Sequence, residues 1–300
     1  MSDKLKDIEC GRFKLNFSNT LVMGILNLTP DSFSDPGSNH DKDRAVKRGL
    51  ELEKQGADIL DIGGESTRPG SDPVSADQEL KRIIPVITEL RKKTRILISV
   101  DTTKAKVAEE ALAAGADIVN DISAFRFDDG MPLLLSETGA SVVLMHMKGV
   151  PKTMQNNTYY EDLYQEIGCF LKERITTATA YGIKREKIIV DPGIGFGKSV
   201  EHNLAIINNL DFLKELDRPI LLGISRKSFI GKILNLPPQN RIEGTIASAV
   251  LSVLRGAHIL RVHDVEQVKR AITVAEAIID EGFTAQNDKG PEKESTFRYV

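Results

Sequence analysis

The 300-residue sequence predicts an α/β fold, a (β/α)8 TIM barrel with a short N-terminal β-hairpin or strand. Two observations predict the barrel: eight short apolar runs recur along the chain, and nearly all of them are followed by a helical pattern. Parallel strands need crossover helices, so this alternation indicates a parallel sheet. An open doubly wound sheet is the competing arrangement, but eight units without an interrupting linker favour closure into a barrel.

The elements begin ahead of the barrel. Phe13, Leu15 and Phe17 alternate with polar residues, which predicts a strand or hairpin outside the main fold. The first barrel strand begins at Leu21, and its apolar run stops at Asn27, where a Thr-Pro-Asp-Ser loop follows. Barrels present catalytic groups in this way, on a loop at the end of a buried strand. On this stretch alone, a core strand followed by an ordinary turn fits equally well.

The remaining units repeat this pattern. A capping box of Ser75 and Gln78 opens one of the helices. From Phe283 the sequence turns polar, so we expect one barrel domain over residues 1–282 and a loose tail over 283–300. The clearest helical patterns cover residues 41–55, 104–114, 162–181, 241–255 and 265–280. The further apolar runs begin near Asp58 and cover Ile96–Val100, Asp117–Val119, Ser141–Met145, Ile188–Val190, Pro219–Ile224 and Ile259–Leu260.

The composition indicates a soluble protein of a reducing compartment. The formal net charge of −3 gives no support for binding to nucleic acid or to a membrane surface. The N-terminus lacks the apolar core of a signal peptide, and no apolar run approaches the ~18 residues of a membrane span. Cys10 and Cys169 are too few for a disulfide framework or a cysteine-based zinc site. We therefore expect a cytoplasmic location.

The polar residues at the strand ends divide into two chemical sets. A carboxylate accepts two parallel N–H bonds and so suits the N–H/NH2 edge of a ring such as an aminopyrimidine, whereas clustered cations suit phosphate or pyrophosphate. Together the sets predict a site for a heterocycle at one end and an anion at the other, although each residue alone fits an ordinary solvated strand end. The first set is Asp101, Asn120 and Asp191, and the second is Arg68, Lys227, Arg261 and His263.

Three local features have simpler interpretations. The segment GIGFGK, from Gly193 to Lys198, resembles a phosphate-binding loop but fits neither nucleotide-binding pattern. Its glycines let the backbone approach a flat ligand or simply form a tight loop. His146, between two methionines, is typical of a packed strand end, and no second histidine lies at helix spacing from His263, which argues against zinc.

Seven motifs in sequence order make the chain similar to the dihydropteroate synthase family from Leu21 to about Gly282. One such motif would be weak evidence, but seven in the right order are specific. The motifs are MGILNLTPDSFSD (Met23–Asp35), DIGGESTRPG (Asp61–Gly70), SVDTTKA (Ser99–Ala105), NDIS (Asn120–Ser123), DPGIGFGK (Asp191–Lys198), GISRKSF (Gly223–Phe229) and RVHDV (Arg261–Val265).

The resemblance implies a transferase of folate biosynthesis. Members of the family join 6-hydroxymethyl-7,8-dihydropterin pyrophosphate to p-aminobenzoate, forming 7,8-dihydropteroate and pyrophosphate. The implied partners are these two small molecules, with Mg2+ as the cofactor and a second copy of the chain in a homodimer. Two loops, Thr29–Asn39 and Ser66–Ser75, would close over the pyrophosphate.

The resemblance also implies roles for individual residues. Asn27 would bind Mg2+ through its amide oxygen, and Ser225, at the start of a helix, would receive the benzoate carboxylate. The implied pterin contacts are Asp101, Asn120, Asp191, Lys227 and Arg261. The implied pyrophosphate contacts are Asn27, Arg68, Arg261 and His263. The implied aminobenzoate pocket is Phe33, Thr67, Pro69, Phe196 and Ser225. The implied catalytic residues are Asp35, Arg68, Lys227, Arg261 and His263.

Two other functions compete with this interpretation. A pterin-binding barrel that transfers the methyl group of methyltetrahydrofolate would share the pterin pocket, and a non-catalytic paralogue would bind a pterin without turnover. Both predict loss of the loop residues, and the first also predicts loss of the Ser-Arg-Lys motif. Here TPDSFSD, STRPG and Ser225–Lys227 are all present, so the sequence favours the synthase.

Overall fold

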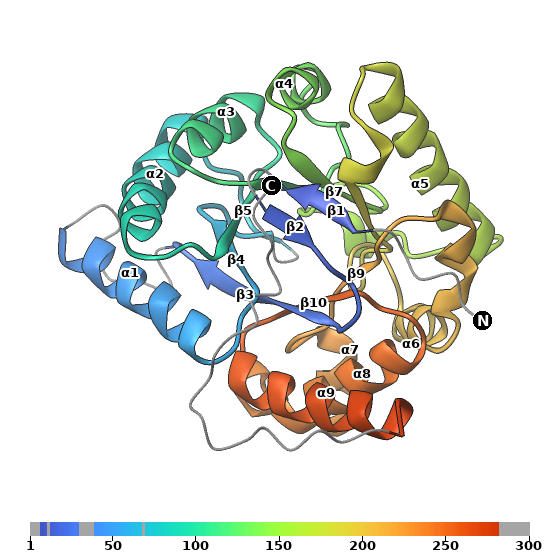
Figure 1. The fold of residues 1–300 in the computed structure, drawn as a ribbon. Coiled ribbons are helices and arrows are strands. Elements are labelled where there is room, and N and C mark those ends of the chain that lie inside the picture. Colours follow the sequence, from blue (N-terminus) through green and yellow to red (C-terminus); the bar gives the residue numbers. More distant parts are fainter. Residues whose placement is uncertain (1–6, 11–12, 30–38, 68–69, 282–300) are drawn as a thin grey trace.

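The computed structural model describes residues 7–10, 13–29, 39–67 and 70–281, and within them the chain forms the predicted barrel (Figure 1). Eight parallel strands are hydrogen-bonded in the order β8-β7-β6-β5-β4-β3-β10-β9. A parallel bridge between Val190 and Ile220 joins the two ends of this order. The open-sheet alternative is therefore wrong.

The strands lie close to the predicted runs. One strand is shorter than predicted: the apolar run Pro219–Ile224 contains β9, which covers only three residues. The barrel strands are β3 (Leu21–Asn27), β4 (Ile59–Gly63), β5 (Leu97–Asp101), β6 (Ile118–Asp121), β7 (Ser141–Met145), β8 (Ile188–Asp191), β9 (Leu221–Gly223) and β10 (Ile259–Val262).

Helices surround the barrel, as the alternation predicts. The predicted capping box is present, because the Ser75 side chain accepts from the Gln78 amide and the Gln78 side chain accepts from the Ser75 amide. The α-helices are α1 (Asn39–Lys54), α2 (Ala76–Lys93), α3 (Ala105–Ala113), α4 (Met131–Thr138), α5 (Leu163–Ala180), α6 (Val200–Asn208), α7 (Ser228–Leu234), α8 (Ile242–Leu254) and α9 (Val265–Ile279). Short 3-10 turns are η1 (Met154–Asn156), η2 (Arg185–Lys187), η3 (Leu210–Leu216) and η4 (Pro238–Asn240).

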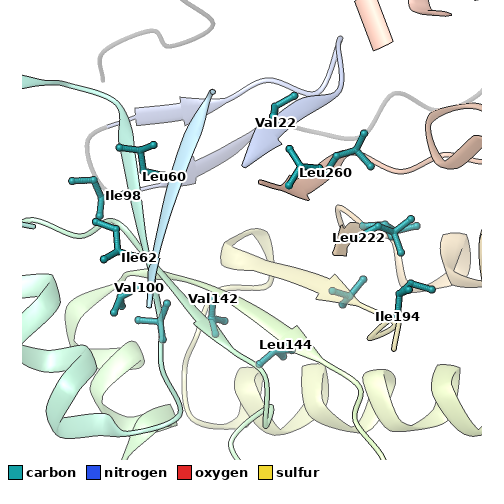
Figure 2. Close-up of a cluster of buried hydrophobic side chains, with 14 of the residues drawn as sticks. Val22, Leu60, Ile62, Ile98, Val100, Val142, Leu144, Ile194, Leu222 and Leu260 are labelled. Atoms are coloured by element: carbon teal, nitrogen blue, oxygen red, sulfur yellow. The ribbon is translucent and has the colours of Figure 1, made fainter. Parts of the chain in front are cut away.

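The two-residue period of the strands separates two layers of side chains. Alternate residues of each strand point outwards and pack against the surrounding helices, and Figure 2 shows this outer layer. This layer is apolar because it lies between the strands and the surrounding helices, where water is excluded. The strand residues labelled there are Val22, Leu60, Ile62, Ile98, Val100, Val142, Leu144, Leu222 and Leu260, and Ile194 joins them from the segment after β8.

The inward-facing residues at the N-terminal end of the barrel form a second apolar core, which the N-terminal hairpin covers. Strands β1 (Ile8–Cys10) and β2 (Phe13–Leu15) pair antiparallel and lie across the barrel in Figure 1. Their four inward side chains pack against one residue from most of the barrel strands, so the hairpin closes the bottom of the barrel. The cluster consists of Ile8, Cys10, Phe13, Leu15, Leu21, Met23, Ile59, Leu97, Ile118, Val143, Ile189, Leu221 and Ile259.

Two further expectations concern membrane spans and the C-terminal tail. Among the helices of the described residues, none is both long and apolar enough to cross a membrane. The predicted tail of residues 283–300 lies outside the described residues, so the division of the chain at residue 282 stays a prediction.

Candidate active site

The inward-facing layer changes from apolar to charged towards the C-terminal ends of the strands. Two residues after the apolar Ile59 comes Asp61, and two residues after Leu97 comes Ser99, both fully buried. On β10, Arg261 likewise lies two residues after the apolar Ile259. Because C-terminal strand ends of a barrel face one mouth, these buried polar groups define a candidate site.

Arg261 joins the carboxylates of two neighbouring strands. Its Nε donates to Asp61 Oδ2 at 2.5 Å and a terminal nitrogen donates to Asp101 Oδ2 at 2.7 Å. Asn120 Nδ2 donates to the same oxygen of Asp61 at 3.2 Å. Sequence analysis placed these residues in two chemical sets, and the structure pairs Arg261 of the basic set with Asp101 of the acidic set.

Asp61 is the site residue that sequence reasoning missed. It lies within a quoted motif, but it is not a strand end, and only its place two residues after an inward apolar residue marks it as inward-facing. Its Oδ1 and the hydroxyl of Ser99, its register partner on β5, are buried and without a hydrogen-bond partner among the described residues. The floor of the site therefore holds unsatisfied polar atoms next to Arg261.

Burial controls the charge of Asp101 in this network. Burial raises the pKa of the Asp101 carboxyl to about 7, the guanidinium of Arg261 opposes this rise, and the nearby carboxylate of Asp61 adds to it. Burial disfavours the charged form of Arg261, but Asp61 and Asp101 outweigh it and raise the Arg261 pKa above its ordinary value. Arg261 is therefore a permanent cation that opposes the protonation of Asp101.

A second group gathers at the end of β8. Asp191 Oδ1 accepts from the Gly193 amide at 2.6 Å, and Lys227 Nζ lies 4.3 Å from the ring centroid of Phe196. Burial raises the pKa of Asp191 to about 6, against the Gly193 hydrogen bond and the charges of Lys227, Lys198 and Arg261. Burial also lowers the pKa of Lys227 to about 8. The group combines a carboxylate, a cation and an aromatic face.

The wall beside Phe196 is apolar and rich in methionine. Phe196 packs in one buried cluster with Ile122, which follows β6, and Met145, which ends β7. Met147 and Met154 complete the cluster. Methionine side chains adapt their shape and contact aromatic rings favourably, so this wall suits a flat aromatic ligand.

The glycines of the GIGFGK loop make its close approach to β7 possible. Gly193 has a positive φ of 73°, and a Cβ atom there would lie 1.9 Å from the carbonyl oxygen of His146. No side chain fits in that space, so the loop needs glycine for packing as well as for backbone conformation. The interpretation as a tight loop is supported.

Gly193→Ala is expected to destabilise the fold by about 3 kcal/mol or more, because the backbone at His146, which follows β7, must move to relieve the overlap. Gly139→Ala is the matched control: its φ is 66°, but nothing lies within 4 Å of a Cβ there, and a loss of about 1 kcal/mol is expected from the left-handed conformation alone. Urea unfolding of both variants measures the difference. Equal losses would contradict the packing argument.

The Ser-Arg-Lys motif is arranged differently from the expectation. Helix α7 begins at Ser228, so Ser225 does not lie at a helix start, and that part of the prediction is wrong. Instead the Ser225 hydroxyl is hydrogen-bonded to His263, at 3.2 Å from the backbone nitrogen and 3.0 Å from Nδ1. The three residues from Ser225 turn back sharply because Arg226 has a positive φ of 56°. The hydrogen bonds therefore fix the positions of Ser225 and His263 relative to each other.

The side chains of two arginines fix the conformation of this turn. The guanidinium of Arg226 forms two hydrogen bonds with the carboxylate of Asp264, at 2.9 and 2.5 Å. Arg241 donates to the carbonyl oxygens of Arg226 and Lys227 at 3.0 and 3.2 Å. Charge-assisted and bidentate bonds of this kind are strong, so the backbone that carries Lys227 is fixed.

The other predicted residues lie at the rim or outside the described residues. Asn27 ends β3 at a half-buried position, and Thr67 is half-buried at the start of the second loop. Lys104 Nζ bonds both Glu65, at the end of the DIGGE segment, and the buried Glu79 of α2. This ion pair anchors the base of the second loop and was missed. Outside the described residues lie Phe33, Asp35, Arg68 and Pro69.

No cluster of three or more histidine, cysteine, aspartate or glutamate side chains that could hold a metal occurs among the described residues. His146 is buried 5.0 Å from the ring of Phe170 in an edge-on contact, which confirms that it is a packed residue. A hard cation that takes most of its ligands from a bound phosphate needs fewer protein groups.

The fold and the site together define a class of protein. It is a (β/α)8 barrel whose mouth holds buried carboxylates paired with a guanidinium group. Residues 23–263 match the family model described as pterin binding enzyme. The chain belongs to the pterin binding enzyme family and, within it, to the dihydropteroate synthases.

The relatives support this membership over nearly the whole chain. The chain is 44% identical to dihydropteroate synthase of Escherichia coli (strain K12) over 265 residues, covering 88% of this chain and 94% of the relative. It is 48% identical to dihydropteroate synthase of Synechocystis sp. over 260 residues, covering 86% and 90%.

Solved structures agree with the sequence relatives. Yersinia pestis dihydropteroate synthase in complex with a sulfonamide drug has a TM-score of 0.87 and 42% identity, covering 92% of this chain and all of that one. Dihydropteroate synthase from Xanthomonas albilineans in complex with 7,8-dihydropteroate has a TM-score of 0.82 and 41% identity, covering 91% and 99%. The barrel and its N-terminal hairpin are thus the fold of this family.

Proposed function

We propose that the chain condenses 6-hydroxymethyl-7,8-dihydropterin pyrophosphate with p-aminobenzoate, giving 7,8-dihydropteroate and pyrophosphate. The observation that carries this proposal is the buried network of Asp61, Asp101 and Arg261 at the mouth of the barrel. It supplies an anionic acceptor for the N–H edge of a ring and a fixed cation beside it. The relatives named above carry the same activity in their names.

Pterin recognition uses the carboxylates and the amide. Asp101 and Asp191 accept N–H groups of the ring, and Asn120 offers one donor and one acceptor to an edge of mixed character. Lys227 donates to a ring oxygen or nitrogen. Arg261 leaves Asp101 when the ring arrives, keeps its bond to Asp61, and stacks its guanidinium on the ring, as planar arginine groups do.

The pyrophosphate lies at the rim, where the basic groups are. Arg261, His263 and Arg68 neutralise its charge, and Asn27 supplies one oxygen ligand to Mg2+. The fit of the metal is supported by the Asn27 amide, which is half-buried at the mouth and has no hydrogen-bond partner among the described residues. When bound, Mg2+ neutralises part of the charge on the pyrophosphate oxygens. Removal of Mg2+ with a chelator tests the assignment by its effect on pyrophosphate affinity.

The reaction is dissociative in this proposal. The C–O bond between the exocyclic carbon and pyrophosphate breaks, and the electron pair leaves with pyrophosphate, held by Arg261, His263 and Arg68. The electron-rich pterin delocalises the resulting cation, which Asp35 stabilises. The neutral amine of p-aminobenzoate then forms the C–N bond and loses one proton to solvent. No serine or cysteine nucleophile is needed.

The two loops would complete the proposed aminobenzoate pocket, which also includes Phe196 of the GIGFGK loop. Phe33, Pro69 and Phe196 form its apolar walls, and Thr67 belongs to its rim. The carboxylate binds at Ser225, whose hydroxyl is already oriented by His263. This arrangement links the carboxylate end of the second substrate to the histidine that holds the leaving group.

An assay with both substrates and Mg2+ tests the proposed function. Dihydropteroate and pyrophosphate should appear in equal amounts, and neither should appear when p-aminobenzoate is omitted. If pterin pyrophosphate bound without any product, the non-catalytic alternative would hold. If methyltetrahydrofolate were demethylated instead, the methyltransferase alternative would hold.

The homodimer is supported by an apolar face on the outside of the barrel. Helices α6, α7 and α8 lie side by side (Figure 1), and a groove of about 400 Å³ between them is lined mostly by apolar residues. Leu204 and Leu251, which line the groove, are 43% and 52% exposed. Contiguous exposed apolar surface of this kind marks an interface, and a second copy of the chain is the proposed partner.

Leu251→Glu is expected to convert the dimer to a monomer, because a buried unpaired charge at the centre of an interface costs several kcal/mol. Light scattering after size-exclusion chromatography measures the mass. Leu133→Glu on α4 is the matched control, since Leu133 is 53% exposed on another side of the barrel and should leave the mass unchanged. A monomeric parent protein would refute the dimer.

We also propose a cytoplasmic location. Cys10 is buried and Cys169 is exposed, and both are free thiols. An exposed free thiol is compatible with a reducing compartment. Cell fractionation followed by detection of the chain tests the location.

A further inference from the structure

Lys198, the last residue of the GIGFGK loop, has no role in the proposed reaction and is nonetheless deeply buried. Only 3% of it is exposed. Its Nζ lies 2.9 Å from His146 Nδ1, 3.1 Å from the Phe196 carbonyl oxygen and 3.4 Å from the His146 carbonyl oxygen. An ammonium group has three N–H donors and no acceptor, so the three neighbours satisfy it completely.

These contacts fix the state of His146. Because the ammonium group only donates, Nδ1 of His146 accepts, and the ring proton lies on Nε2. Burial and the charge of Lys198 both lower the pKa of His146 well below its ordinary value, so the ring is neutral. Lys198 therefore carries the charge of this pair.

Other side chains bind the rest of the loop. Gln155 Nε2 donates to the Gly195 carbonyl at 2.8 Å, and the Tyr160 hydroxyl donates to the Gly197 carbonyl at 3.0 Å. Asn203 Oδ1 accepts from the Gly195 amide at 2.7 Å. These three partners are neutral. Lys198 differs from them because it adds a positive charge beneath the loop.

The loop connects Lys198 to two site residues. Asp191 precedes the loop and accepts from its first glycine, and Phe196 lies under Lys227. The charged groups that face Asp191 are Lys198 from the loop, Lys227 from the end of the Ser-Arg-Lys motif and Arg261 from β10. Those that face Lys198 are Asp191, Lys227 and Lys148, together with the neutral His146.

We propose that Lys198 is a positioning residue, which holds the GIGFGK loop against the end of β7 and keeps the carboxylate of Asp191 ionised so that it can accept from the N–H edge of the pterin. The inference rests on the proposed function for the identity of the ligand. Its geometric basis is the complete set of acceptors around Nζ and the direct bond between the loop and Asp191. Lys198 acts through these neighbours and does not itself contact the substrate.

The electrostatics agree with this role. Burial raises the pKa of Asp191 to about 6, and Lys198 is one of the cations that oppose the rise. Burial lowers the pKa of Lys198 to about 7, while Asp191 opposes this fall. Each group stabilises the charged form of the other, so the loss of the Lys198 charge must raise the pKa of Asp191.

Lys198→Met tests the proposal by the titration of Asp191. The midpoint of the Asp191 carboxyl 13C shift, assigned with Asp191→Asn, should rise by ~1 pH unit in the ligand-free protein. Pterin pyrophosphate affinity should then fall by about fivefold more at pH 6 than at pH 8. Lys187→Met is the matched control, because Lys187 is also buried but precedes β8 at the opposite end of the same strand.

An unmoved Asp191 midpoint, or an equal loss of affinity at both pH values, would overturn the proposal and leave Lys198 a purely structural residue. If Lys198→Met does not fold, Lys198→Gln, which keeps N–H donors but no charge, is measured in the same way. A wild-type chain that forms no dihydropteroate would refute the proposed function while leaving the titration readable. A normal turnover with an unmoved midpoint would refute only the inference.

Discussion

Asp101→Asn should weaken pterin pyrophosphate binding by about 100-fold or more, because the neutral amide cannot accept two N–H bonds as a carboxylate does. Hydrogen bonds to a charged group contribute about 1.5–3 kcal/mol each, and the variant also turns an N–H donor towards the N–H edge of the ring. The barrel should still fold, since Arg261 keeps its bond to Asp61 at 2.5 Å. Isothermal titration calorimetry with pterin pyrophosphate measures the loss.

Asp58→Asn is the control for this variant. Asp58 lies next to the other end of β4, where its carboxylate accepts from the Val22 amide at 2.8 Å and from Lys269 at 3.0 Å. Its replacement should lower the free energy of unfolding and leave pterin affinity unchanged. If Asp101→Asn bound the pterin with wild-type affinity, recognition of the ring edge by this carboxylate would be refuted.

Arg261→Met should lower kcat by about 1,000-fold, because a cation that stabilises the leaving pyrophosphate is lost together with the stacking surface. The protein should also be less stable by about 3–5 kcal/mol, since removing one partner of a buried ion pair leaves the other charges uncompensated. Here two carboxylates, Asp61 and Asp101, are left behind. Steady-state kinetics and urea unfolding measure the two losses.

The pH dependence of this instability has a definite sign. The folded-state pKa of Asp101 is about 7, above the unfolded value of about 4. A raised carboxyl pKa contributes stability that is present below about pH 4 and is lost as the pH rises towards 7. Without Arg261 the folded-state pKa rises further, so the stability of the variant should keep falling to a higher pH than that of the wild-type protein.

Two comparisons separate stability from catalysis. Arg91→Met removes a similarly buried arginine, which bonds Asp117 at 2.6 Å near the N-terminal ends of the strands, and should lose stability but keep its kcat. Adding Asp61→Asn to Arg261→Met should recover part of the stability without recovering kcat. An Arg261→Met enzyme with near wild-type kcat would refute the role of this cation in stabilising the leaving group.

Local sequence patterns predicted the barrel and several residues of the candidate site. Strand and helix periods are local properties of the chain, and eight alternating units without a linker leave little choice of topology. Asp101, Asn120 and Asp191 were recognisable because each ends an apolar run, where a barrel displays its functional groups. The capping box at Ser75 is likewise a local signal, and the structure confirms it.

The tertiary structure alone decided how these groups are paired. Asp61 and Arg261 are 200 residues apart, and no local pattern predicts that their side chains meet inside the barrel. The role of Ser225 changed for the same reason, because its hydroxyl contacts His263 on another strand. Lys198 fits no phosphate-loop pattern. Its burial among acceptors depends on contact between the GIGFGK loop and the end of β7. Pairing depends on distance in space, which the order of residues does not contain.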